Sequence, residues 1–307
     1  MSNHADLNLH ASPVAEGVRF QIGSATAFAV RKESKDIALR IRREYHPARE
    51  AMERVPFVRG IVRLICGTAD FLDGVSESAQ LMPQQIVKGT RFEQRFAELF
   101  RVNPTVFVAT LSGIAALLLL AALVILGPWA LAKYVLPLYE LPRPAINGLT
   151  CASRVLGGLI CAALIPRLRI VNRLCMYRGA INKVLNTSPG RDGRVSRERA
   201  EQASHLTRRS DAAFTVAVLL LSIVAFALIR TFTLPVQLLV RALIVLAIAA
   251  VLGEPIRLLE NAAPRHIAAA ALLSPLSGLE RLLTRRPHEQ MVEVAVYAFN
   301  AARENDR

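Results

Sequence analysis

The sequence predicts an α-helical membrane bundle with about four transmembrane helices and a small α+β cytoplasmic region, built from the N-terminal segment, the middle loop and a C-terminal helix. The chain has 307 residues and is 53% hydrophobic but only 6% aromatic, which is more aliphatic than a soluble core of this size requires. Its formal net charge is +14, and its Lys and Arg residues gather between long apolar runs. This pattern is typical of the bacterial inner membrane, whereas a nucleic-acid binder would carry the charge without the apolar runs.

Residues 1–103 are expected to form the cytoplasmic α+β region. Runs at 18–22, 25–32 and 37–43 are separated by turn residues, and they predict strands of a small antiparallel sheet. Apolar side chains recur at helical spacing from Phe57 to Gln80. We therefore expect a helix that packs one face on the sheet or on the membrane surface.

Residues 104–165 are expected to form a transmembrane hairpin. The run Pro104–Leu126 carries no charge and is about the 20 residues needed to cross hydrocarbon. The second run, Ala145–Ile165, carries Arg154 near its middle. A charge at that depth is costly unless it is paired or hydrated, and Glu140 and Glu254 are candidate partners.

A second hairpin is expected over residues 212–253, with spans at 212–229 and 235–253. Arg241 lies in the first two turns of the last span, from where it can reach back to the outer face. Eleven Lys and Arg residues lie in the loop 166–211 that joins the two hairpins. Short basic loops stay in the cytoplasm, so this loop and both termini are predicted to lie on the cytoplasmic side.

The C-terminal residues 254–307 are expected to return to the cytoplasmic region. The apolar run Ile267–Leu283 is interrupted by Pro275 and Gly278, so it predicts an interfacial or re-entrant segment rather than a span. A final helix is expected to begin at Thr284 or Pro287. One face of that helix carries its apolar side chains, which are Met291, Val294, Ala295, Ala298 and Phe299.

Short motifs occur in a fixed order along the chain. They are Glu16-Gly17-Val18, Ala29-Val30-Arg31, Pro56-Phe57-Val58-Arg59-Gly60, Arg257-Leu258 and Thr284-Arg285-Arg286-Pro287, followed by Glu293-Val294-Ala295. Together with the apolar segments between them, these motifs cover most of residues 13–100 and 145–300. In this order and spacing they resemble the YqhQ-like family of uncharacterised bacterial membrane proteins.

The resemblance also implies a metal-dependent enzyme, because that family is often described as one and has two polar motifs beside the middle loop. Where the family reads Tyr-His-Gly-Ala-Glu-His-Lys, this chain reads Tyr177-Arg178-Gly179-Ala180-Ile181-Asn182-Lys183. The His and Cys of the second motif are replaced here by Thr207 and Ser210. The chain therefore looks like a divergent member without the family's metal ligands. It is expected to bind no metal or other cofactor, and a noncatalytic role is expected over an enzymatic one.

Arginines stand at the positions where the resemblance implies ligands. Arg178, Arg208 and Arg209 predict a cationic patch for anionic lipid phosphates or an acidic protein partner. The simpler interpretation is that these arginines belong to the basic loop that stays inside. Arg154 and Arg241 could instead form an anion-coordinating pair in a transport pathway.

The favoured hypothesis is a noncatalytic membrane scaffold or assembly factor that contacts lipids, an acidic protein and a further copy of itself. One alternative is a membrane-embedded metal-dependent hydrolase with a rebuilt site. Another is a small anion or lipid transporter. The hydrolase would draw its donors from the N-terminal region, where Glu16, His46, Asp70, Asp73 and Glu77 are available.

Overall fold

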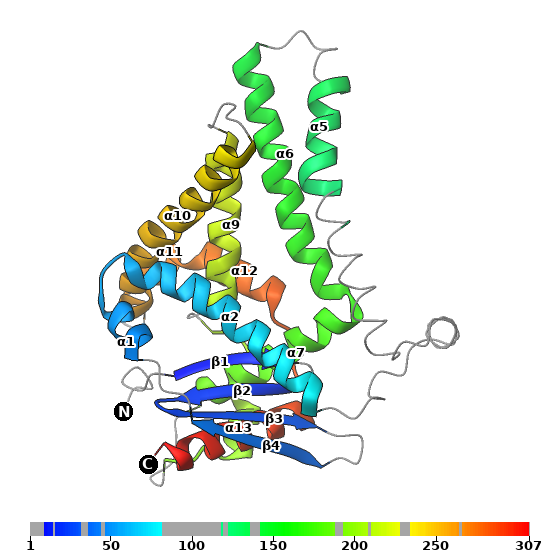
Figure 1. Cartoon of the computed structure of the whole chain (residues 1–307). Helices are drawn as coiled ribbons and strands as arrows, with labels where there is room; N and C mark the ends of the chain where they lie inside the picture. The colour runs from blue at the N-terminus through cyan, green and yellow to red at the C-terminus, as the bar shows by residue number, and fades with distance from the viewer. Residues whose placement is uncertain are drawn as a thin grey trace, which may run out of the picture.

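The computed structural model describes residues 9–14, 16–31, 36–43, 47–81, 118, 122–135, 142–187, 193–207, 210–227, 234–263 and 266–306. An N-terminal sheet lies at one end of the molecule, and apolar helices rise from it (Figure 1). The described α-helices are α1 (Pro47–Arg54), α2 (Val58–Leu81), α5 (Gly127–Ala130), α6 (Arg143–Leu164), α7 (Arg169–Leu185), α8 (Arg197–Gln202), α9 (Asp211–Ala227), α10 (Leu234–Ala262), α11 (Ile267–Leu272), α12 (Ser274–Leu283) and α13 (Glu289–Asn305).

The sheet is a four-stranded antiparallel meander in the order β1-β2-β3-β4. Its strands are β1 (Leu9–Val14), β2 (Gly17–Ile22), β3 (Ala25–Arg31) and β4 (Ile37–Arg43). The three predicted strands are therefore confirmed, and β1 is an addition. The sequence of β1 reads poorly as a strand because it contains Pro13, but an edge strand tolerates a proline that a central strand would not.

One face of the sheet packs against the C-terminal helix. Phe20 of β2 and Phe299 of α13 meet edge to face, with ring centroids 5.6 Å apart, and both side chains are fully buried. Helix α7 joins this core through Ile181 and Val184, and α8 through Ala200. The predicted middle loop therefore contains two helices of the domain core. The apolar face predicted for the final helix is confirmed, since all five of its side chains are buried.

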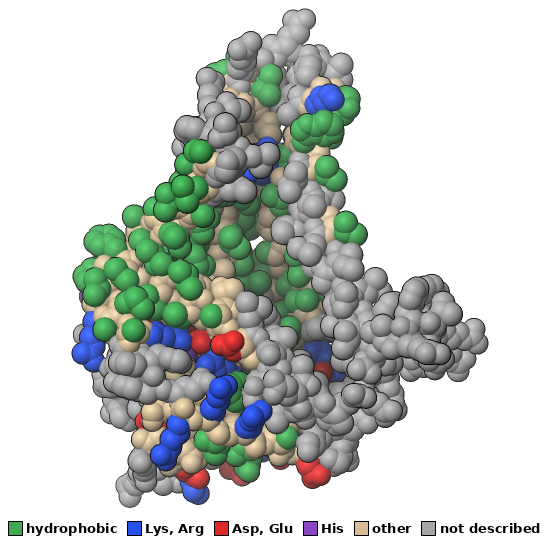
Figure 2. All heavy atoms as spheres, viewed as in Figure 1, with side chains coloured by type: hydrophobic (Ala, Val, Ile, Leu, Met, Phe, Trp, Pro, Cys, Tyr) green, Lys and Arg blue, Asp and Glu red, His purple; other side chains and the backbone are tan. Residues whose placement is uncertain are grey.

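Two described helices are long and apolar enough to cross a membrane, Pro144–Arg167 and Leu239–Ala262, and a shorter apolar helix spans Asp211–Phe226. Figure 2 shows hydrophobic side chains over the half of the molecule that contains α9 and α10, and charged side chains gathered toward the sheet. The expected span Pro104–Leu126 falls largely outside the described residues. The count of four spans and their orientation stay predictions.

Helix α2 lies between the sheet and the apolar helices (Figure 1). Near its start, Arg59 forms an ion pair with Glu254 of α10, and Arg63 reaches Asp211 of α9 at 2.7 Å. Further along, Asp70 accepts from Arg19 of β2 at 2.7 Å. The helix expected from Phe57 to Gln80 is thus confirmed, and its first half connects the two halves of the molecule.

Candidate functional site

A buried carboxylate is the centre of a polar cluster that joins three helices. The side chain of Glu280, on α12, is 1% exposed. Its Oε1 accepts hydrogen bonds from Asn182 Nδ2 at 2.8 Å and from Thr284 Oγ1 at 2.7 Å. Ser210 Oγ donates to Oε2. A carboxylate at this depth is stable only when its oxygens are matched in this way.

Arg178 supplies the positive charge of the cluster. Its Nε lies 3.6 Å from Glu280 Oε1, and its Nη2 donates to Ser210 Oγ at 3.0 Å. Ser210 also caps α9, because its Oγ accepts from the backbone N–H of Ala213 at 3.0 Å. The three elements α7, α9 and α12 are therefore connected through one serine hydroxyl and one carboxylate.

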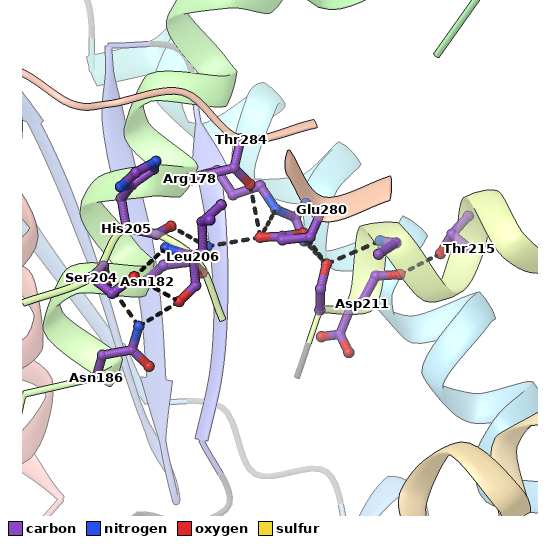
Figure 3. Close-up of polar contacts among 12 residues, drawn as sticks. Arg178, Asn182, Asn186, Ser204, His205, Leu206, Asp211, Thr215, Glu280 and Thr284 are labelled. Carbon is purple, nitrogen blue, oxygen red and sulfur yellow. Dashed lines mark hydrogen bonds and ion pairs between the residues drawn. The ribbon is translucent and has the colours of Figure 1, made fainter. Parts of the chain in front are cut away.

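Two asparagines one turn apart on α7 extend the network (Figure 3). Asn182 donates to the carbonyl of His205 at 2.9 Å. Asn186 donates to the carbonyls of Ser204 and Leu206 at 2.9 and 2.8 Å. These side-chain amides satisfy backbone groups of a segment that has no regular secondary structure, so they hold it against α7.

The chemistry of this cluster does not fit a divalent cation. A metal site needs several neutral or anionic donors converging on one point, but here a guanidinium occupies the space beside Glu280. Within the described part of the chain, no group of three or more His, Cys, Asp or Glu side chains could hold a metal ion. The nearby thiol is not activated either, since burial raises the pKa of Cys175 to about 11.

Three of the substituted motif positions meet in this cluster. Arg178, Asn182 and Ser210 stand where the resemblance implies His, His and Cys, and all three contact the Glu280 network. Ile181, which replaces the motif's Glu, instead lies in the domain core. Arg208 and Arg209 lie outside the described residues, so the proposed patch is placed only through Arg178, which is 19% exposed and faces Glu280.

The remaining motif positions serve packing. A Cβ on Gly17 would lie 2.1 Å from the Ala29 carbonyl oxygen, and one on Gly179 would lie 2.2 Å from that of Arg285. Gly60 is in similar contact with α10. Each of these places therefore needs a residue without a side chain. The same Cβ on Gly179 would lie 3.1 Å from Pro287 Cδ, and Tyr177 is 2% exposed in the core.

The charged motif positions form ion pairs or hydrogen bonds. Glu16 pairs with Arg173, and burial raises the pKa of its carboxyl in spite of that arginine. Lys183 donates to the carbonyl of Glu201. Glu293 lies 3.5 Å from Arg31.

The donors considered for a hydrolase are held by arginines, are exposed, or lie outside the described side chains. Burial alone would raise the pKa of Asp70, but Arg19 and Arg49 outweigh it and hold that pKa below its ordinary value. Asp73 is exposed. His46 and the side chain of Glu77 are outside the described part of the chain.

The two arginines of the apolar helices have different surroundings. The guanidinium of Arg241 lies over the ring of Phe226 on α9, 5.4 Å from its centroid. The Nε of Arg154 is buried and has no hydrogen-bond partner among the described groups. Glu254, considered as a partner for Arg154, binds Arg59. An anion-coordinating pair of these arginines stays a prediction.

Sequence reasoning missed Glu280, the residue that organises the cluster. The sequence does contain a signal, since Glu280 is the one carboxylate within the apolar run Ile267–Leu283. A lone acid in such a run is expensive unless a donor meets it. The run itself divides into α11 and α12, and Pro275 lies in the first turn of α12, where a proline needs no N–H partner.

Comparison with known proteins agrees with the sequence resemblance. The family described as "Protein of unknown function (DUF1385)" matches residues 55–305. The uncharacterized protein YqhQ of Bacillus subtilis (strain 168) is 23% identical over 291 residues, which cover 94% of this chain and 89% of that protein. No solved structure matches the chain.

Proposed function

The chain belongs to the DUF1385 family, and we propose that it is a noncatalytic scaffold or assembly factor of the inner membrane. In this proposal the apolar helices anchor the domain formed by the sheet, α7, α8 and α13. That domain presents a cationic surface to an acidic protein on the cytoplasmic side. The observation that carries the proposal is the Glu280 cluster, where both carboxylate oxygens already accept hydrogen bonds from protein side chains and so are not free as a reactive centre would need.

The cluster joins the two halves of the molecule, which are the sheet with its helices and the apolar helices. Arg178 and Asn182 belong to α7, which packs on the sheet, whereas Ser210 begins the apolar helix α9. A buried ion pair can be replaced by well-packed apolar groups without loss of folding, but removal of one partner leaves an uncompensated charge. A catalytic carboxylate could not be replaced in this way.

The partner surface is best placed at the edge strand β4. Arg40, Arg42 and Arg43 are exposed there, together with Ile41, which is 39% exposed. An edge strand also offers backbone groups for pairing with another chain. Arginines on an edge favour an acidic partner over self-association, because like charges oppose the pairing of two copies.

The first experiment compares Glu280→Ala with the double variant Arg178→Met/Glu280→Leu in detergent. We expect the single variant to lose about 3–5 kcal/mol of stability and the double variant to recover most of it. Metal analysis of the wild type, purified without chelators, is expected to find no stoichiometric metal. Stoichiometric metal that Glu280→Ala removes would contradict the proposal.

The second experiment places a photo-crosslinking amino acid at Ile41 and isolates what it captures. We expect one acidic protein, whose capture is lost when Arg40, Arg42 and Arg43 are changed to Glu. Arg194→Glu is the matched control, because that side chain is 61% exposed but belongs to another segment. If the crosslinking variant captures no protein, and the wild type converts a small molecule with saturable kinetics, the scaffold proposal is refuted.

A further inference from the structure

The corner between α1 and α2 exposes an aromatic side chain in an unusual backbone conformation. Phe57 has a φ of 63°, in the left-handed region that favours glycine or asparagine. Its side chain is 55% exposed, so packing inside the protein does not explain why a large residue stands there. An outlier of this kind points to a function for the side chain.

The corner is held firmly on α10. The backbone N–H of Phe57 donates to Glu254 Oε1 at 2.6 Å, and Arg59 Nε donates to the same oxygen at 2.7 Å. Glu254 therefore holds the backbone of Phe57 and the side chain of Arg59. The direction in which the Phe57 ring leaves the corner is set by this anchored turn.

The contact between α2 and α10 places the corner at the end of an apolar helix. A Cβ on Gly60 would lie 2.1 Å from the carbonyl oxygen of Ala249, and Ala249 belongs to the apolar stretch Leu239–Ala262. Phe57 lies less than one turn before Gly60 along the chain. The corner is thus beside the segment where α10 changes from uninterrupted apolar sequence to charged residues, beginning with Glu254.

Other exposed apolar side chains lie within a few residues of Phe57 in the sequence or one turn from its partner Glu254. Met52 and Val55 of the α1 side are 43% and 47% exposed, and Leu258, one turn after Glu254 on α10, is 68% exposed. Exposed Arg54 and Arg257 stand next to them in the sequence. Apolar and aromatic groups beside basic ones are the composition of a surface that enters an anionic bilayer interface.

We propose that this corner is an interfacial membrane anchor, in which Phe57, Val55 and Leu258 enter the lipid headgroup region of the leaflet that surrounds the end of α10. Arg54 and Arg257 meet the lipid phosphates. The anchor adds the α1–α2 corner to the end of α10, and it sets the tilt of α2 and therefore of the sheet beneath it. This inference rests on the proposed membrane anchoring.

Tryptophan fluorescence tests the depth of Phe57. The chain has a single tryptophan, Trp129, so Phe57→Trp in a Trp129→Phe background gives one reporter. The protein is reconstituted in vesicles of phosphatidylglycerol and phosphatidylcholine with brominated acyl chains. We expect the emission of the introduced tryptophan to be quenched, most strongly when the bromine lies near the headgroup end of the acyl chain. Val55→Trp in the same background should repeat this result if Phe57→Trp folds poorly.

Two controls separate the anchor from membrane insertion. Ile41→Trp, on the exposed edge of the sheet, should keep its emission in brominated lipid. Trp129 of the otherwise unchanged protein lies on α5, beside α6, and reports whether the apolar helices are in the bilayer. Quenching of Trp129 without quenching of the reporters introduced at Phe57 or Val55 overturns the anchor alone. Absence of quenching at all these positions overturns the membrane anchoring as well.

Discussion

Gly60 of α2 and Gly253 of α10 cross in direct backbone contact. A Cβ on Gly253 would lie 2.8 Å from the Gly60 Cα, so neither helix has room for a side chain at the crossing. Backbones that approach this closely bring many atoms into van der Waals contact. The same crossing brings Arg59 to Glu254 and Arg63 to Glu260, and it thus positions α2 between the sheet and the apolar helices.

Gly60→Ala should force the two helices apart. The added methyl group would meet the Ala249 backbone, and overpacking of this kind costs about 1–3 kcal/mol. Gly67→Ala is the matched control on the same helix, because a Cβ there meets nothing within 4 Å and alanine should stabilise the helix by about 0.5–1 kcal/mol. Thermal unfolding in detergent measures both. Equal effects of the two substitutions would show that the crossing does not depend on glycine.

Asp70 should make the protein sensitive to acid. Because Arg19 and Arg49 lower its folded-state pKa, its contribution to stability is present above the unfolded pKa of about 3.9 and is lost as the pH falls through the folded value. Asp70→Asn should cost about 1–3 kcal/mol at pH 7 and flatten the stability curve below about pH 4. Unfolding measured from pH 7 down to pH 3 checks this. Exposed Asp73→Asn should leave the curve unchanged.

Phe299→Ala should detach the C-terminal helix from the sheet. The ring is fully buried against Phe20, and loss of a buried phenylalanine costs about 3–5 kcal/mol. Tyr297, on the same helix, is 49% exposed, and its change to Ala should cost less than about 1 kcal/mol. Limited proteolysis should cut within residues 289–305 in the first variant only. A wild-type digestion pattern for Phe299→Ala would contradict the role assigned to α13.

The predicted topology places the middle loop inside the cell. In a background without Cys66, Cys151, Cys161 and Cys175, a cysteine at exposed Glu198 should resist a membrane-impermeant maleimide applied to intact cells. A cysteine at exposed Lys133, in the connection predicted to lie outside, should be labelled. Permeabilised cells supply the control for Glu198. The opposite labelling pattern would reverse the orientation of the chain.

Local sequence patterns predicted most of the elements. Long apolar runs indicated α6, α9 and α10, since the free energy of membrane insertion sums over neighbouring residues. The spacing of Met291, Val294 and Phe299 indicated which face of α13 is buried. The same patterns gave no sign that α10 continues past Gly253 to Ala262, because charged residues enter the helix there and its further turns are supported by α2.

The sequence predicted only part of the candidate site. The positions of Arg178, Asn182 and Ser210 were singled out by their departure from a resembling motif, but their partner was not. Glu280 lies 98 residues from Asn182 and 70 from Ser210. A hydrogen bond between residues so far apart produces no periodic pattern in the sequence, because each partner alone looks like an ordinary polar residue.

By itself, the sequence determined the family, the alternation of apolar and basic segments, and the strands and helices that local periodicity encodes. Only the tertiary structure decided how charges are matched. It paired Arg178 with Glu280 and Arg59 with Glu254, and it left Phe57 exposed at a strained corner. The reason is physical: burial of apolar groups is nonspecific and follows composition, whereas a buried charge is stabilised only by particular atoms that packing brings within a few ångströms.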